Sequence, residues 1–243
     1  MLLGHAPDAV NVIQRPDRQS SVDASCELKA AGFEAVMHLV ARGTTGRMLE
    51  ATLERAGEAA IGNVLCILGD TKDGPAIKVK DLVAATVRAL PGALVGATLN
   101  QYGDRPERAV ANLLAKLEAG ATFVETQPVF DAGALEPFVE SARKEVPGTR
   151  FVAMLMPITS PDALRRMEAR LRIAAPDDYA RRIADGPQSA WEAFAEIIDS
   201  LRRSRLVDGL AIMTPDMDPP AETVARIAAA LLPAGVRSSS RLE

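Results

Sequence analysis

The chain has 243 residues, of which 48% are hydrophobic and 25% are charged, and its formal net charge is −4. This length fits one large α/β domain, and the composition is that of a soluble globular protein. An acidic balance without a long run of Lys or Arg argues against nucleic-acid binding. No apolar run approaches the roughly 20 residues that a membrane span needs, and the first ten residues lack the pattern of a secretory signal. We therefore expect a cytoplasmic protein.

The residue types argue against two further classes of protein. Cys26 and Cys66 stand singly in apolar segments, which is typical of reduced core thiols. The chain has two histidines and no HxH, HxxxH or CxxC pattern, so we expect no metal site. It also has no GxSxG motif, which argues against acyl transfer as the chemistry of this chain.

Apolar runs and helical spacings alternate along the chain. In the first half, the pattern predicts a strand at 9–13, a helix at 20–31, a strand at 35–41, a helix at 45–60, a strand at 63–68, a helix at 79–90, a strand at 93–99 and a helix at 105–119. In the second half, it predicts a strand at 121–125, a helix at 134–146, a strand at 151–156, helices at 160–173, 177–184 and 190–204, a strand at 209–213 and a helix at 223–232. The helix at 45–60 is expected to be amphipathic, with Met48, Leu49, Leu53 and Ala56 as its apolar stripe.

The alternation predicts a parallel sheet covered by helices, since the strands are apolar throughout. A (β/α)8 TIM barrel fits best, because no strand is followed by a Gly-rich dinucleotide or phosphate loop. Seven strands can be identified where a closed barrel has eight, and the strand without a counterpart in the pattern is the first. We expect residues 1–233 to form a single barrel domain and residues 234–243 to be a disordered tail.

The stretch at 120–131 reads GATFVETQPVFD and carries the strongest local signal. Its strand ends at Thr126 and Gln127, because Pro128 has no amide to donate to a sheet. Parallel α/β folds bind ligands at the carboxyl ends of their strands. The Gln127 amide can donate and accept at once, as the edge of a pterin or pyrimidine requires. The alternative interpretation is that Gln127 merely satisfies a loop backbone.

Other strand ends place further polar residues at the same mouth of the barrel. They are Gln14, Arg15, His38, Gly69, Asp70, Thr98, Asn100, Thr159 and Thr214. Glu125 lies within its strand and faces either the barrel or the helices. The candidate proton-transfer groups are His38, Asp70 and, if it turns inward, Glu125. A histidine on an apolar strand is more often a satisfied core residue than a ligand, and Asn112 and Lys116 would ordinarily form a solvated helix face.

Four motifs carry a resemblance to a known family. They are MHLVARG from Met37, NVLCILGD from Asn63, VGATLN from Val95, and the run from Asn112 through KLEAGATFVETQPVFD. With these motifs the chain resembles the flavin-dependent methylenetetrahydrofolate reductases. The resemblance implies a (β/α)8 barrel, FAD as cofactor, and an oxidoreductase that interconverts 5,10-methylene- and 5-methyltetrahydrofolate.

The resemblance also implies roles for individual residues. Those that match cofactor-binding positions are His38, Ile67, Gly69, Gly96, Ala97, Asn100, Asn112 and Lys116. Asp70, Thr126 and Gln127 match the substrate side, where Gln127 would bind the pterin. Asp70 would be catalytic, by stabilising the cationic iminium form of the folate.

Three departures from the family pattern modify this expectation. The first strand, with the Glu that the family uses as proton donor, is absent. Leu68 replaces a residue that is usually polar or basic, and the loop after Asp70 (TKDGPAIKVKD) is short. An open barrel leaves unpaired strand edges, so a second copy or a partner chain completing the barrel is one expectation.

Two other functions are consistent with the same residues. The first is an accessory subunit that binds tetrahydrofolate without flavin. The second is a methyltransferase that takes its methyl group from methyltetrahydrofolate. Both would be colourless proteins, whereas a flavin-dependent reductase would be yellow.

Overall fold

A computed structural model describes residues 7–15, 17–70, 77–103, 105–216 and 218–232. Within them the chain forms one seven-stranded sheet whose spatial order follows the chain order, with every neighbouring pair parallel. The strands are Val10–Val12 (β1), Ala35–Val40 (β2), Asn63–Ile67 (β3), Leu94–Leu99 (β4), Phe123–Thr126 (β5), Arg150–Leu155 (β6) and Gly209–Ile212 (β7).

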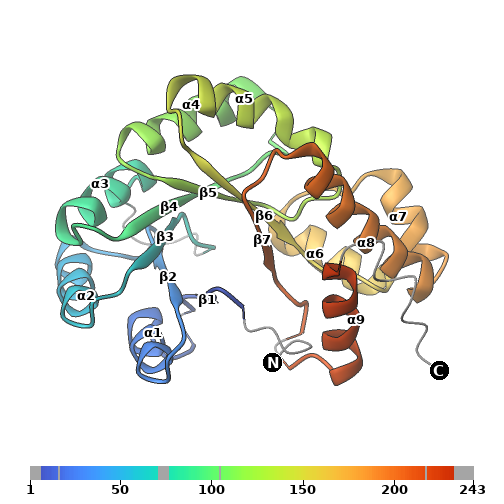
Figure 1. Cartoon of the computed structure of the whole chain (residues 1–243). Helices are drawn as coiled ribbons and strands as arrows, with labels where there is room; N and C mark the ends of the chain where they lie inside the picture. Colours follow the sequence, from blue (N-terminus) through green and yellow to red (C-terminus); the bar gives the residue numbers. More distant parts are fainter. Residues whose placement is uncertain (1–6, 16, 71–76, 104, 217, 233–243) are drawn as a thin grey trace.

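The sheet curls into an arch, and the helices lie along its outer side (Figure 1). The helices are Ser21–Ala30 (α1), Gly46–Glu58 (α2), Val79–Ala89 (α3), Pro106–Glu118 (α4), Glu136–Glu145 (α5), Pro161–Leu171 (α6), Asp177–Ala184 (α7), Pro187–Ser204 (α8) and Ala221–Leu231 (α9), with a 3-10 turn at Ala132–Leu135 (η1). This is a half-barrel of the TIM type, as the sequence predicts. The expected tail at 234–243 and part of the loop after Asp70 (71–76) lie outside the described residues.

Side-chain caps fix where several helices begin. The hydroxyls of Ser20, Thr45 and Ser160 accept hydrogen bonds from the amides of Asp23, Met48 and Ala163, and so satisfy amides that have no partner within the helix. Pro161 occupies the first turn of α6, where its missing amide costs nothing. The same rule places Pro187 at the start of α8, so the predicted start at residue 190 is wrong by three residues.

The two faces of each strand have different environments. Val64, Val124 and Phe151 are fully buried and belong to the hydrophobic core between the sheet and the outer helices. Because side chains alternate along a strand, their neighbours point to the concave side of the arch. In β5 this alternation sends Phe123, Glu125 and Gln127 toward the concave side. The question left open by the sequence is thereby answered: Glu125 faces the barrel, not the helices.

The arch has two free edges within the described chain. β1 pairs only with β2, and β7 pairs only with β6. β1 has just three residues, and every residue of β7 is half-buried, in contrast to the buried central strands. Figure 1 shows these strands at opposite ends of the arch. The sheet is therefore open where a complete barrel would be closed.

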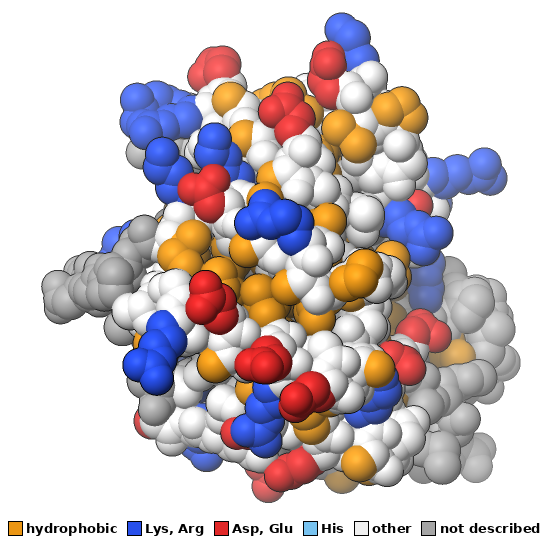
Figure 2. All heavy atoms as spheres, turned by 90° about the vertical axis from the view of Figure 1, so that its left-hand side faces the viewer, with side chains coloured by type: hydrophobic (Ala, Val, Ile, Leu, Met, Phe, Trp, Pro, Cys, Tyr) orange, Lys and Arg blue, Asp and Glu red, His pale blue; other side chains and the backbone are white. Residues whose placement is uncertain are grey.

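The outer surface is mixed in character. The face that carries α1, α2 and α3 shows interspersed basic and acidic side chains, with hydrophobic side chains gathered near its centre (Figure 2). Met48 on α2 is 54% exposed, whereas Leu49, Leu53 and Ala56 of the same apolar stripe are buried. Both cysteines are free, Cys66 buried and Cys26 half-buried. No helix among the described residues has the length and apolarity that crossing a bilayer requires.

Candidate functional site

The concave side of the arch encloses a cavity of about 1840 Å³, which we call the central cavity. Ligand pockets for one small molecule usually measure about 300–1,000 Å³, so this space is large enough for more than one ligand. Its wall combines strand side chains that point inward with the loops that follow the strands. The wall residues that the sequence singled out are Gln14, Arg15, His38, Ile67, Gly69, Asp70, Thr98, Asn100, Asn112, Lys116, Glu125 and Gln127.

Gln127 follows β5 and presents an unused side-chain amide to the central cavity. Its Oε1 is buried and has no hydrogen-bond partner among the described residues. Its backbone is fully occupied: the amide donates to the Leu99 carbonyl at 3.0 Å and to Gln101 Oε1 at 3.1 Å. The alternative interpretation, in which the Gln127 side chain satisfies the loop, therefore does not hold. The side chain is available to a ligand.

The residue that does hold this loop is Gln101. Its Nε2 donates to the Gln127 carbonyl at 3.0 Å while its Oε1 accepts from the Gln127 amide, so the two residues form a closed pair of hydrogen bonds. Next to it, the Tyr102 hydroxyl donates to the Pro128 carbonyl at 2.8 Å and accepts from the Phe130 amide at 3.3 Å. The loop after β4 thus fixes the loop after β5, and with it the position of Gln127.

His38 lies on β2 with both ring nitrogens unpaired. The residue is 8% exposed, and neither Nδ1 nor Nε2 has a partner in the described part of the chain. Burial lowers its pKa from the ordinary 6.5 to about 4, so the ring is neutral at physiological pH. Unpaired polar atoms in a buried site are costly, which makes them candidates for contact with a bound molecule.

Lys116 and Asn112 line the central cavity from α4, where Lys116 is half-buried and Asn112 is exposed. Lys116 Nζ donates to the Thr98 carbonyl at 2.7 Å, and burial lowers the pKa of its ammonium group. Other basic side chains surround them. Basic residues outnumber acidic ones on the wall: Arg15, Arg42, Lys78, Lys80, Arg105, Arg108, Lys116 and Arg170 against Asp17, Asp70 and Glu125. The site therefore suits an anionic ligand, although the whole chain is acidic.

Glu125 is the acidic residue buried deepest in this wall. It is 6% exposed, and its Oε2 accepts a hydrogen bond from Asn11 Nδ2 at 3.0 Å. Asn11 belongs to β1, so the bond crosses the concave side from one end of the arch to its middle. Burial raises the pKa of the Glu125 carboxyl, and the bond from Asn11 partly opposes this. Asp70, by contrast, is exposed at the mouth.

Two glycines on the concave side are required by close contacts. Gly69 has φ +86°, and a Cβ there would lie 2.3 Å from Val40 Cγ1. A Cβ on Gly96 would lie 2.2 Å from the Phe123 ring. Gly69 lines the central cavity beside Ile67, whereas the space next to Gly96 is taken by Phe123.

Several predicted site residues lie elsewhere. Ala97 is fully buried in the core on the helix side of β4. Thr126 is fully buried, and its hydroxyl donates to the Gln127 carbonyl and accepts from the Met154 amide, which are contacts within the sheet. Thr159 and Thr214 are not part of the cavity wall. Thr126 therefore supports the position of Gln127 and does not itself reach the cavity.

Sequence reasoning missed three parts of this site. Gln101 and Asn11 became visible only through their bonds to distant residues, 26 and 114 positions away. The basic wall is contributed by segments scattered from Arg15 to Arg170, so no run of charge signals it. Gln101 could have been suspected, because it lies two residues after the end of the strand predicted at 93–99.

A parallel α/β half-barrel with a polar cavity at the carboxyl ends of its strands defines the class of a TIM-type ligand-binding protein. The chain belongs to the methylenetetrahydrofolate reductase family, whose sequence profile, described as "Methylenetetrahydrofolate reductase", matches residues 7–214. This match confirms the family expected from the sequence motifs and supports a reductase-like function in general.

Two further comparisons add little. A search of curated proteins gives no significant match. Among solved structures, a protein provisionally assigned as a deoxyribose-phosphate aldolase from Coccidioides immitis aligns with 12% identity and a TM-score of 0.44, over 94% of this chain and 73% of that chain. A likeness this distant says nothing about activity.

Proposed function

We propose that the chain is an oxidoreductase that interconverts 5,10-methylene- and 5-methyltetrahydrofolate with FAD as cofactor. Family membership supports the general reaction. The observation that carries the proposal is the unpaired amide of Gln127 in a cavity large enough for two ligands. A pterin edge offers both hydrogen-bond donors and acceptors, and the side-chain amide can pair with both.

The residues of the central cavity fit a flavin dinucleotide. His38 presents unpaired ring nitrogens on one wall, beside the Gly69 turn. Lys116, Asn112 and Arg108 of α4 line another part of the wall and offer the cation and amide donors that a diphosphate accepts. We assign the ring to the His38 side and the diphosphate to the α4 side. When bound, FAD would supply the hydride chemistry, which no side chain can provide.

The protein's own residues bind, orient and shield the folate. Gln127 holds the pterin, and the Gln101 pair keeps the Gln127 backbone in place. Asp70 lies at the mouth of the same cavity, where a carboxylate would favour the cationic iminium form of the folate over its neutral form. The residues that match the family pattern but do not reach the cavity, Ala97 and Thr126, act through packing and through the sheet.

The test is a titration of the purified protein with 5-methyltetrahydrofolate while its absorbance spectrum is recorded. We expect a flavin spectrum that bleaches as the folate transfers its reducing equivalents. Gln127→Ala should weaken folate binding about tenfold, the equivalent of one hydrogen bond to a buried group, and leave FAD binding unchanged.

Gln188→Ala on the outer helix α8 is the matched control, since it removes the same amide from an exposed position. Equal folate affinities for Gln127→Ala and the control would contradict the assignment of Gln127. If the protein is colourless but still binds tetrahydrofolate, the reductase proposal is wrong, and the protein is an accessory subunit or a methyltransferase.

A further inference from the structure

Glu125 has a buried carboxyl group that faces the central cavity. It is 6% exposed and lies on the wall of the central cavity, which Gln127 also lines just after the end of β5. Two residues along a strand span roughly 6.6 Å, so a ligand held by Gln127 lies within one small-molecule length of Glu125. The carboxyl is therefore close to the folate position.

No cation compensates this carboxyl within the described residues. Its hydrogen bond comes from the neutral amide of Asn11, and no Lys or Arg forms an ion pair with it there. Its strand neighbours on the two sides are Thr98 and Val152, neither of which is charged. A buried carboxyl without a cation keeps its proton to higher pH than an exposed one.

The other titratable groups of the cavity do not replace it as a proton donor. His38 on β2 is neutral because its pKa is about 4, and it has no proton to donate as an acid at neutral pH. Asp70 is exposed at the mouth. Lys116 on α4 donates to the Thr98 carbonyl. The remaining charged groups on the wall are Arg15, Asp17, Arg42, Lys78, Lys80, Arg105, Arg108 and Arg170.

We propose that Glu125 is the general acid of the proposed folate reaction, held in position by Asn11. This assignment rests on the proposed function. In the direction of reduction, the bond between the bridging methylene carbon and N10 breaks, its electron pair goes to N10, and the Glu125 proton is transferred to N10. The N5 lone pair forms the iminium double bond, and a bound flavin would supply the hydride that this carbon requires. The Glu125 carboxylate then regains a proton from water.

The first test measures the protonation of Glu125 directly and needs no ligand. The protein is labelled with ¹³C at the glutamate carboxyl groups, and its NMR spectrum is recorded as a function of pH. We expect one carboxyl signal to remain protonated above the pH at which the others ionise, and to be missing from Glu125→Gln. A spectrum in which every glutamate titrates in the ordinary range overturns the assignment.

The second test separates proton transfer from support of the half-barrel. Glu125→Gln keeps an oxygen that can accept the bond from Asn11 but has no acidic proton. We expect its kcat to fall by about a hundredfold or more with folate affinity retained. A variant that keeps the wild-type kcat overturns the assignment, and the thermal unfolding midpoint shows whether the variant is folded.

A third test uses Asn11→Ala, which keeps the acidic group and removes its hydrogen-bond donor. It leaves the acid in place and removes the bond that lowers its pKa, so the alkaline limb of the pH–kcat profile should move to higher pH. Burial also lowers the pKa of Lys116, so the limb that belongs to Glu125 is identified as the one missing from Glu125→Gln. If the limb does not shift in Asn11→Ala, the bond from Asn11 does not tune the acid, and the role proposed for the pair is overturned.

Failure of the assignment differs from failure of the proposed function. Wild-type protein that neither binds nor turns over a reduced folate overturns both. Wild-type protein that turns over the folate, together with an active Glu125→Gln, overturns the assignment alone.

Discussion

At the scale of single residues, the position of a side chain on its strand decides whether it serves the core or the cavity. Glu125 and Thr126 are consecutive, yet Glu125 faces the cavity, whereas Thr126 faces the buried side between the sheet and the outer helices. The sequence identifies the polar residues at the strand ends, but it does not say which face each one takes. That face is set by the register of the sheet, because a shift of one residue exchanges the two sides.

His38 makes the pH dependence of stability a measure of this burial. Its pKa is lowered to about 4 in the folded state, so between pH 6.5 and pH 4 the unfolded state binds the proton more readily. The free energy of unfolding therefore decreases as the pH falls through this interval. Between pH 7 and pH 5 this amounts to about 2 kcal/mol. His38→Gln should reduce the loss of unfolding free energy over that interval by about this amount.

Urea unfolding of the wild type and of His38→Gln at both pH values measures the difference. The carboxyl groups titrate in both proteins, so their contribution cancels in the comparison. Equal losses in the two proteins would show that the ring is not shielded from water in the folded state.

At the scale of elements, the sequence predicts nearly every helix and strand because the caps, prolines and apolar runs are local signals. Ser20, Thr45 and Ser160 begin helices as expected. The hydrogen bonds from Gln101 to the loop after β5 could not be predicted in the same way, since they join residues 26 positions apart. Contacts of this kind depend on which strands lie side by side.

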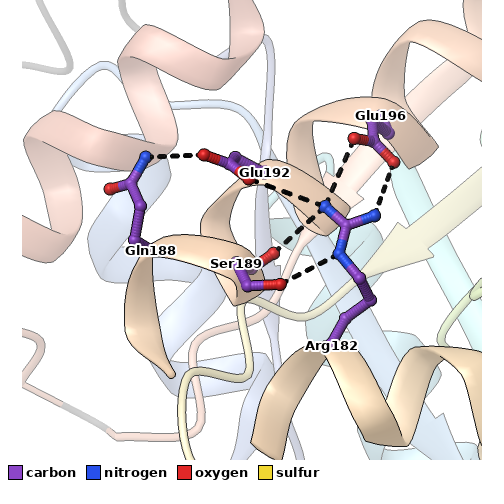
Figure 3. Close-up of polar contacts among 5 residues, drawn as sticks. All are labelled: Arg182, Gln188, Ser189, Glu192 and Glu196. Carbon is purple, nitrogen blue, oxygen red and sulfur yellow. Dashed lines mark hydrogen bonds and ion pairs between the residues drawn. The ribbon is translucent and has the colours of Figure 1, made fainter. Parts of the chain in front are cut away.

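Arg182 joins two helices that cover the end of the sheet near β6 and β7. From α7 it bonds both carboxylate oxygens of Glu196 on α8, at 2.9 and 3.2 Å, and its Nε donates to Ser189 Oγ at 3.0 Å (Figure 3). Glu192 lies 3.9 Å away and itself accepts from Gln188. Because the pair is partly solvated, its contribution is modest, although the two-pronged geometry favours it.

We expect Arg182→Ala to lower the free energy of unfolding by about 1 kcal/mol. Arg182→Lys should restore only part of this, because an ammonium group cannot bond two carboxylate oxygens and a hydroxyl in the same plane. Arg181→Ala on the same helix is the control for removing an exposed cation. Chemical denaturation of the three variants tests the expectation, and equal stabilities for the Arg181 and Arg182 variants would refute it.

At the scale of the whole molecule, the net charge and the local charge have opposite signs. The chain carries −4 overall, while its cavity wall is dominated by Lys and Arg. Composition alone therefore gives no sign of an anion site, because the basic wall residues are far apart in the sequence. The fold gathers them at the carboxyl ends of the strands.

This arrangement predicts a salt-dependent affinity for FAD. Raising the ionic strength from 0.05 M to 0.5 M should weaken FAD binding about tenfold, because added ions screen the basic wall. Riboflavin has the same ring without phosphates, so its affinity should change far less. Fluorescence titration of both ligands at several salt concentrations measures these affinities. In Arg108→Gln, the affinity for FAD should depend less on salt than in the wild type. Parallel salt dependences for the two ligands would contradict the placement of the diphosphate beside α4.

The consecutive order of the strands has a consequence for how the molecule comes apart. Each βα unit contacts the units before and after it in the chain, so the sheet resembles a linear array of repeats more than a closed ring. Units in the middle of such an array are supported on both sides, whereas the end units are supported on one. The backbone amides of β1 and β7 should therefore exchange with solvent through local opening, and those of β3 to β5 only in the rarer, larger unfolding events. The wall that carries Asn11 thus belongs to the part of the protein that opens first.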